Sequence, residues 1–135
     1  MFSGFTFPLT PSTQEQDGGN PLLFGAATMK HITHDDMAET LMTQPHHGLR
    51  VFVFYSDHCP ACMQYKRNYA KQYYDKFPTV HFYNIDTANK NLTRTVKRMQ
   101  IEAIPTFVFV KNGSIVQQLR GHNPQAMMQA LTQHA

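Results

Sequence analysis

The stretch that decides the fold runs from residue 51 to residue 62. It joins an apolar run to the two cysteines of the chain: Val51-Phe52-Val53-Phe54-Tyr55 and then Cys59-Pro60-Ala61-Cys62. The apolar run is typical of a buried strand and the residues after Cys59 are typical of a helix, so Cys59 is predicted where a strand ends and a helix begins. Free N–H groups and partial positive charge at a helix N-terminus favour the thiolate, which is the reactive form of cysteine. Cys62 follows one turn later and can close a disulfide with Cys59, so the sequence predicts a redox-active pair.

The composition predicts one domain with a modest tail. The 135 residues carry a net charge of +3, and the basic residues are scattered, unlike the dense cluster of a nucleic-acid-binding surface. No run approaches the roughly 18 apolar residues of a membrane helix. No Lys or Arg precedes Lys30, so the pattern is not that of a secretory or mitochondrial leader. We therefore expect a cytoplasmic protein, in which a lone cysteine pair is catalytic or metal-binding rather than structural.

Residues 1–27 differ in character from the rest of the chain. They are rich in Gly, Pro, Ser, Thr, Gln and Asn, and phenylalanines interrupt them without a period. This composition is typical of an appended, partly disordered arm. The phenylalanines belong either to a floppy tail or to a segment that docks on the body or on a partner. We expect the folded domain to cover residues 28–135.

Strands and helices are expected to alternate through most of this domain. The first three strands are predicted at residues 30–32, 49–56 and 80–86. Helices are predicted after the second and third of them, at residues 59–76 and 91–100. Asn112-Gly113 between two apolar runs is a strong β-hairpin signal. Asn123-Pro124 starts a last helix as N-cap and first helical residue. The order predicts an α/β protein with a five-stranded mixed sheet, strand 49–56 at its centre, and four flanking helices.

This arrangement resembles the thioredoxin family over about residues 30–135. The resemblance rests on landmarks that follow one another in the family's order: Cys59-Pro60-Ala61-Cys62, Asn84-Ile85-Asp86, Ile104-Pro105-Thr106, Lys111-Asn112-Gly113 and Gly121. A lone C-x-x-C is weak evidence, whereas all of these landmarks in sequence are strong evidence. The resemblance implies a thioredoxin fold.

The chemistry expected of the cysteine pair is thiol–disulfide exchange. Cys59, as a thiolate, would attack a substrate disulfide, and Cys62 would then resolve the mixed disulfide and leave the pair oxidised. The resemblance implies that Pro105 is cis and lies against the pair, and that Ile104, Pro105 and Gly121 shape the groove for an extended substrate. It also implies disulfide-containing protein substrates and a reductase or thiol donor as partners. We expect a monomer that needs no cofactor or metal and binds neither nucleic acid nor membrane.

The active-site sequence departs from the family's usual pattern. His58 replaces a tryptophan, and Pro60 and Ala61 replace the usual Gly-Pro pair. His58 is either an ordinary exposed loop residue or a group whose partial charge stabilises the Cys59 thiolate. Thioredoxins bury an aspartate where this chain has Val53, and the lysine that often accompanies it appears here as Phe82. The usual proton-relay pair is therefore expected to be absent.

Other functions remain open at this stage. A thioredoxin-like body could act as a binding or adaptor module in which redox activity is incidental. Pro60 is also common in glutaredoxins, although Arg120-Gly121-His122-Asn123 does not resemble their glutathione-binding segment. A metal carrier would use His58, Cys59 and Cys62, but a structural zinc site needs four ligands. Turnover with glutathione as the sole reductant separates the glutaredoxin-like function from the others.

Overall fold

The computed structural model of the protein describes residues 29–135. The arm expected at residues 1–27 lies outside this described part. Five strands form one sheet: β1 (Met29–Ile32), β2 (Arg50–Tyr55), β3 (His81–Asp86), β4 (Thr106–Lys111) and β5 (Ser114–Arg120). The order across the sheet is β1-β3-β2-β4-β5, so the predicted central strand is indeed central. β1, β3 and β2 run parallel, and β4 and β5 are antiparallel, as the order of elements predicted.

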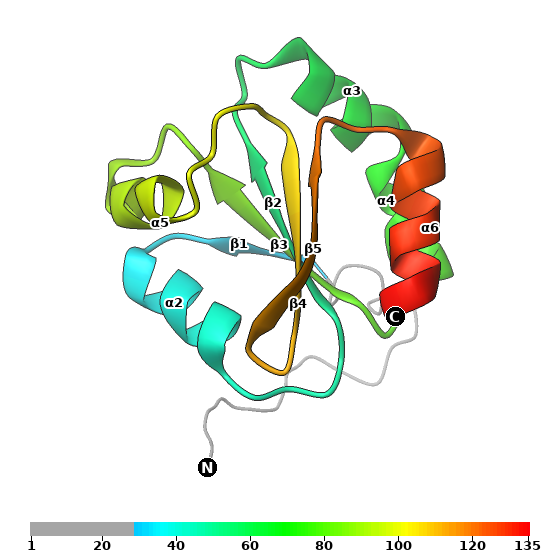
Figure 1. The fold of residues 1–135 in the computed structure, drawn as a ribbon. Helices are drawn as coiled ribbons and strands as arrows, with labels where there is room; N and C mark the ends of the chain where they lie inside the picture. The colour runs from blue at the N-terminus through cyan, green and yellow to red at the C-terminus, as the bar shows by residue number, and fades with distance from the viewer. Residues whose placement is uncertain (1–28) are drawn as a thin grey trace, which may run out of the picture.

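Helices cover both faces of the sheet (Figure 1). On one side lie α2 (Asp35–Thr43) and α5 (Thr93–Arg98), and on the other α3 (Pro60–Asn68), α4 (Ala70–Lys76) and α6 (Pro124–His134). A short 3-10 turn, η2 (Lys90–Leu92), precedes α5. Asn123 caps α6, since its side chain accepts a hydrogen bond from the Ala126 N–H at 3.0 Å.

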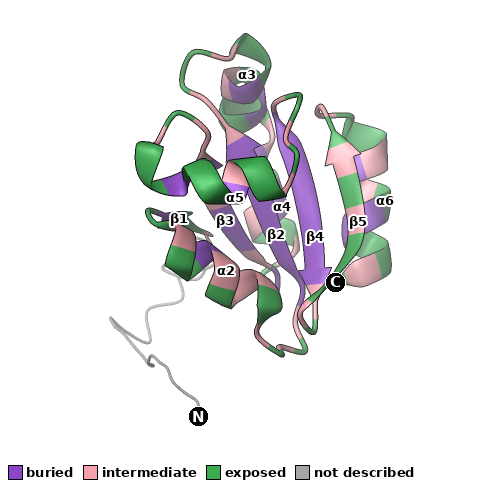
Figure 2. Ribbon diagram, turned by 60° about the vertical axis from the view of Figure 1, so that its left-hand side comes forward, coloured by how far each residue is buried: buried purple, intermediate pink, exposed green. Residues whose placement is uncertain are grey.

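Burial on both faces explains why β2 reads as an unbroken apolar run. Successive side chains of a strand point to opposite faces. Val51 and Val53 join the core beneath α3, α4 and α6, and Phe52 and Phe54 join the core beneath α2 and α5. β2 and β4 are the most continuously buried strands of the sheet (Figure 2), while β5 is largely exposed at one edge.

The predicted number of helices is wrong. The described residues contain five α-helices rather than four, because the helix expected at 59–76 is divided at Tyr69 into α3 and α4. The backbone of Tyr69 leaves helical geometry, with φ −129° and ψ −35°. Its N–H still donates to the Tyr65 carbonyl at 2.9 Å, and its carbonyl accepts from the Tyr73 N–H at 3.3 Å. Helical spacing therefore continues across the break, which is why periodicity could not reveal it.

The β4–β5 hairpin and the Ile104–Pro105 peptide bond position the segments that lie near the cysteine pair. Asn112 and Gly113 have φ values of +53° and +76° and close the β4–β5 hairpin, as the Asn-Gly signal predicted. The Ile104–Pro105 peptide bond before β4 is cis, which confirms the expectation from the family resemblance. The hairpin returns β5 to the level of Pro105, where the Gly121 N–H donates to the Pro105 carbonyl at 2.7 Å.

Candidate active site

Cys59 lies at the junction between β2 and α3, where the sequence predicted it. It is the N-cap of α3, and Pro60 takes a first-turn position, where its missing N–H leaves no broken hydrogen bond. The Cys62 N–H donates to the Cys59 sulfur at 3.2 Å. An N-cap side chain that accepts from the first turn satisfies one of the free N–H groups of the helix. The sulfur of Cys59 therefore faces the positive end of α3.

The two cysteines differ in exposure. Cys59 is partly exposed, whereas Cys62 is 2% exposed, and both are free thiols. Burial, followed by the hydrogen bond with Cys59, raises the pKa of Cys62 to about 12. Cys59 is thus the more accessible of the two thiols, and burial favours the protonated form of Cys62.

The cis-proline segment forms a second wall beside the cysteines. The carbonyl oxygen of Ile104 lies 3.6 Å from the Cys59 sulfur. Pro105 is buried directly after it, and Gly121, with φ +76°, continues this wall from the β5 side. An added Cβ at Gly121 would meet no atom within 4 Å, so its positive φ, rather than crowding, favours glycine there. The structure brings together the three residues that were expected to shape a substrate groove.

The residues that flank the cysteines point outward. His58, Pro60 and Ala61 are exposed. The His58 backbone N–H donates to the Ser56 hydroxyl at 3.2 Å, which fixes the loop before Cys59. Within residues 29–135, no three His, Cys, Asp or Glu side chains gather in a group that could hold a metal ion. In the same part of the chain, no helix is long and apolar enough to cross a membrane.

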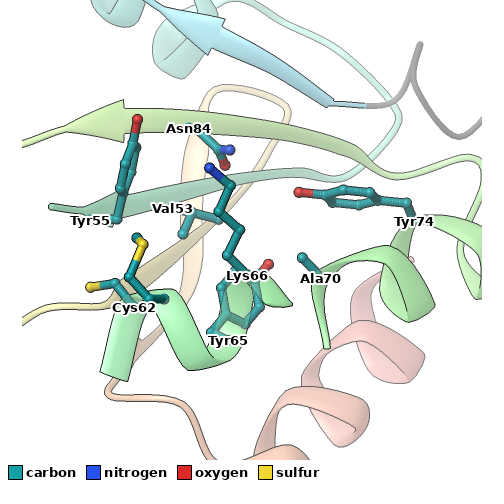
Figure 3. A pocket seen from close by; sticks show the side chains of 9 residues that line it. Val53, Tyr55, Cys62, Tyr65, Lys66, Ala70, Tyr74 and Asn84 are labelled. Carbon is teal, nitrogen blue, oxygen red and sulfur yellow. The ribbon is translucent and has the colours of Figure 1, made fainter. Parts of the chain in front are cut away.

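A small cavity lies on the buried side of Cys62. Its volume is about 20 Å³, and it lies between α3 and α4 on one side and β2 and β3 on the other (Figure 3). Nine residues line it: Val53, Tyr55, Cys62, Met63, Tyr65, Lys66, Ala70, Tyr74 and Asn84. The sequence analysis quoted Asn84 only as a landmark and did not single out Tyr65. The available signal for Asn84 was its place two residues before the end of a strand expected to neighbour β2.

Comparison with known proteins identifies the family. The family model described as thioredoxin matches residues 28–133, which is most of the chain. The chain belongs to the thioredoxin family. The resemblance inferred from the sequence landmarks is thereby confirmed.

Relatives of this thioredoxin-family protein are distant. A thioredoxin-like protein of Acanthamoeba polyphaga mimivirus is 28% identical over 102 residues, which cover 76% of this chain and 73% of the relative. Thioredoxin-1 of Saccharomyces cerevisiae is 30% identical over 87 residues, which cover 64% of this chain and 82% of the relative.

Solved thioredoxins share the fold. The oxidised mitochondrial thioredoxin 3 of Saccharomyces cerevisiae has a TM-score of 0.68 at 23% identity, covering 81% of this chain and 98% of that one. The thioredoxin of Fasciola hepatica has a TM-score of 0.70 at 23% identity, covering 79% and 100%. At this identity the comparisons establish the fold alone.

Two of the positions that depart from the thioredoxin pattern, Val53 and Phe82, carry apolar side chains. Val53 is 2% exposed and Phe82 is fully buried, and both belong to the core beneath α3, α4 and α6. No aspartate or glutamate is among the nine residues that line the cavity beside Cys62. Burial, followed by the carboxylates of Asp86 and Asp57, raises the pKa of Tyr55 at the edge of this cavity. Buried apolar side chains therefore occupy both of these positions.

Proposed function

We propose that this thioredoxin-family protein is a thiol–disulfide oxidoreductase that exchanges electrons with protein disulfides through Cys59 and Cys62. The observation that carries the proposal is the asymmetry of the pair. Cys59 is partly exposed at the N-terminus of α3 and accepts the Cys62 N–H, while Cys62 is buried and its pKa is raised to about 12. An accessible attacking thiol and a shielded resolving thiol are the two parts that this reaction needs.

The reaction is written in two exchange steps. The Cys59 thiolate attacks one sulfur of the substrate disulfide, forms a mixed disulfide and releases the other substrate sulfur as a thiolate. Cys62 then loses its proton and attacks the Cys59 sulfur, which forms the Cys59–Cys62 disulfide and releases the second substrate thiolate. Two electrons pass from the cysteine pair to the substrate, and a reductase or thiol donor must return them for another cycle.

The groove residues are proposed to hold an extended stretch of substrate. Support comes from the Ile104 carbonyl beside the Cys59 sulfur and from the hydrogen bond that joins Gly121 to Pro105. His58, Pro60 and Ala61 surround Cys59 on the exposed side, where they would modulate its reactivity and contact substrate. A reducing compartment such as the cytoplasm suits a lone cysteine pair with this use.

A trapping experiment tests the assignment of roles. Cys62→Ser is expected to attack a disulfide-bonded protein and to accumulate a mixed disulfide, because no second thiol resolves it. Cys59→Ser, the matched control, is expected to form none and to abolish turnover. Trapping by Cys59→Ser but not by Cys62→Ser would reverse the roles, and unchanged turnover in both variants would disprove the proposal.

The reduction potential of the pair decides the direction of electron flow. A reduction potential of about −270 mV indicates a reductase, and one of about −120 mV indicates an oxidant. An equilibrium with a glutathione or thiol redox buffer, followed by alkylation of free thiols, measures it.

A further inference from the structure

His122 connects the candidate substrate groove to the core of the protein. It follows Gly121, which forms part of the groove wall, and it precedes Asn123, the N-cap of α6. Its side chain is half-buried and packs against aromatic rings of α3, α4 and β4. The connection from β5 to α6 thus passes beside α3 and α4 (Figure 1). A residue next to the groove is therefore anchored on the helices that follow the cysteine pair.

Four aromatic rings lie around the imidazole of His122. Their centroids are 4.5 to 6.0 Å from its own, with Tyr69 at 4.5 Å, Tyr65 at 5.2 Å, Tyr73 at 5.8 Å and Phe107 at 6.0 Å. The three tyrosines are spaced four residues apart, so the helical spacing that continues across the break at Tyr69 places them on one side of α3 and α4. The helices therefore define the place that the His122 ring fills.

One hydrogen bond fixes the orientation of this ring. The Tyr73 hydroxyl lies 2.7 Å from His122 Nε2. Burial, followed by Tyr69, raises the pKa of Tyr73 to about 12, so the phenol keeps its proton at neutral pH. A neutral imidazole has one donor and one acceptor nitrogen. The Tyr73 hydroxyl therefore donates to Nε2, and the proton of the neutral imidazole is assigned to Nδ1.

Short contacts continue from His122 to the attacking cysteine. The preceding residue, Gly121, donates its N–H to the Pro105 carbonyl at 2.7 Å. The carbonyl oxygen of Ile104, the residue before this proline, lies 3.6 Å from the Cys59 sulfur. Release of the His122 ring would free the backbone next to the Gly121 N–H. The anchor of the ring and the groove wall therefore belong to one chain of contacts.

The surroundings of His122 favour the neutral imidazole. Burial lowers the pKa of His122 below its ordinary value of 6.5. The side chains that pack against it from α3, from the break between the helices, from α4 and from β4 are Tyr65, Tyr69, Tyr73 and Phe107. None of these four is a carboxylate, so none of them supplies a negative charge to an imidazolium. We therefore expect protonation to release the ring from this place.

We propose that His122 is a positioning residue for the substrate groove: its neutral imidazole, held by the Tyr73 hydroxyl, keeps Gly121 against Pro105. An extended substrate then meets a fixed groove wall beside Cys59. Protonation of His122 releases this anchor and weakens the binding of a protein disulfide. A disulfide too small to use the groove is attacked by Cys59 as before. This inference deepens the proposed thiol–disulfide exchange and rests on it.

A comparison of two disulfides, made on the full chain, tests this role. The reduced protein is mixed in single-turnover experiments with insulin, a protein disulfide, and with a small symmetrical aromatic disulfide whose thiol product is coloured. The ratio of the two second-order rate constants reports the use of the groove, because a change in the reactivity of Cys59 affects both constants. For the wild type we expect this ratio to fall toward acid about fivefold, the factor for one hydrogen bond of ordinary strength. The midpoint of the fall is expected below pH 6.5.

Tyr73→Phe removes the hydroxyl and keeps the ring. We expect its ratio at pH 7 to be about fivefold lower than that of the wild type, with little further change toward acid. Tyr69→Phe is the matched control, because the hydroxyl bonded to His122 belongs to Tyr73 and not to Tyr69. This control is expected to keep the wild-type ratio at every pH. An unchanged ratio in Tyr73→Phe, or an equal fall in Tyr69→Phe, overturns the inference.

His122→Gln keeps an acceptor that does not titrate. Its side-chain oxygen can accept the Tyr73 O–H, so we expect a ratio within about twofold of the wild type at pH 7 and no fall toward acid. A fall of full size in this variant would assign the pH dependence to another group, such as the exposed His58, and would overturn the inference. A wild-type ratio that is independent of pH also overturns it, because the aromatic rings would then retain the imidazolium through cation–π contacts.

Failure of the proposed function would give a different result. The wild type would then reduce neither insulin nor the small disulfide, or Cys59→Ser would reduce both as fast as the wild type. If the wild type reduces both through Cys59 without the expected differences in ratio, the proposed function stands and only the role of His122 is overturned.

Discussion

Two buried polar sites lie on the same pair of strands, and they are built in opposite ways. Arg50 faces His81 where β2 and β3 begin, and Val53 faces Asn84 near where they end. Arg50 is 8% exposed, and its Nη1 donates to the Leu41 carbonyl at 2.9 Å and to the Gln44 side chain at 3.2 Å. The first site thus ties the end of α2 to the sheet.

The second site leaves its polar atoms available. The oxygens of Asn84 and Tyr65 have no partner among the described residues, and both residues line a cavity that Cys62 also lines. At the Arg50 site a single guanidinium nitrogen, Nε, is left unpaired in the same sense. Protein groups thus pair most of the donors of the first site, whereas two polar atoms of the second site have no such partner in the described residues. The predictions below test this difference.

The largest expected effect comes from placing a charge at the second site. Val53→Asp buries a carboxyl group in the core beneath α3, and we expect a loss of about 3 kcal/mol in the free energy of unfolding at pH 7. Burial raises the pKa of the carboxyl above its unfolded value of about 3.9, so the loss grows as pH rises through this range. Urea unfolding at pH 7 and at pH 4 measures it.

The matched control for this substitution is Val53→Asn, which has the same shape and does not titrate. Its loss is expected to be the same at both pH values. Equal losses at both pH values in Val53→Asp would mean that the carboxylate is solvated, and that this site is no more shielded than the surface.

The next effect concerns acid at the first site. Burial, with the charges of His46, Arg50 and Lys30, lowers the pKa of His81 to about 4. His81 therefore binds a proton near pH 6.5 in the unfolded chain, whereas in the folded protein it binds one only near pH 4. The contribution of neutral His81 to the free energy of unfolding is fully present above the unfolded pKa. It falls by about 2–3 kcal/mol as the pH drops from 7 to 4.

Urea unfolding of His81→Gln against pH measures the contribution of this ring. The variant is expected to lose most of the acid-dependent fall, leaving the smaller part from His46, whose pKa burial also lowers. If the variant keeps the whole acid-dependent loss of stability, this loss originates outside the Arg50 site.

The main features of the sheet could be predicted from the sequence. The unbroken apolar run predicted β2 and its central place, because a strand covered on both faces needs no alternation. Asn-Gly predicted the hairpin, because that pair adopts the positive φ values that such a turn requires. The order of elements predicted the parallel and antiparallel parts of the sheet. Local signals were therefore enough for the sheet, although not for the number of helices.

The parts that escaped prediction depend on three-dimensional neighbours. The ring of Tyr69 packs 4.5 Å from that of His122, and neither the break at Tyr69 nor this contact leaves a mark on helical spacing. The place of Asn84 at the cavity beside Cys62 became visible only with the β2–β3 register, which sets it opposite Val53. The cis bond at Pro105 came from the family resemblance, because an isolated Ile-Pro pair does not predict it.

The smallest effect comes from removing the cation of the first site. Arg50→Met keeps the apolar length of the side chain and removes the donor to Leu41 and Gln44, so we expect a loss of about 2 kcal/mol at pH 7. The charge of Arg50 helps to lower the pKa of His81, so the fall in stability toward acid is expected to become shallower. Turnover of a disulfide-bonded protein is expected to keep its wild-type rate, because Arg50 lies on the other face of the sheet from the Cys62 cavity. Arg98→Met, which removes an exposed arginine 3.4 Å from Glu39, is the control and is expected to change stability by no more than about 0.5 kcal/mol. Slower turnover in Arg50→Met would show that the two sites are coupled through β2 and would contradict their separation by the sheet.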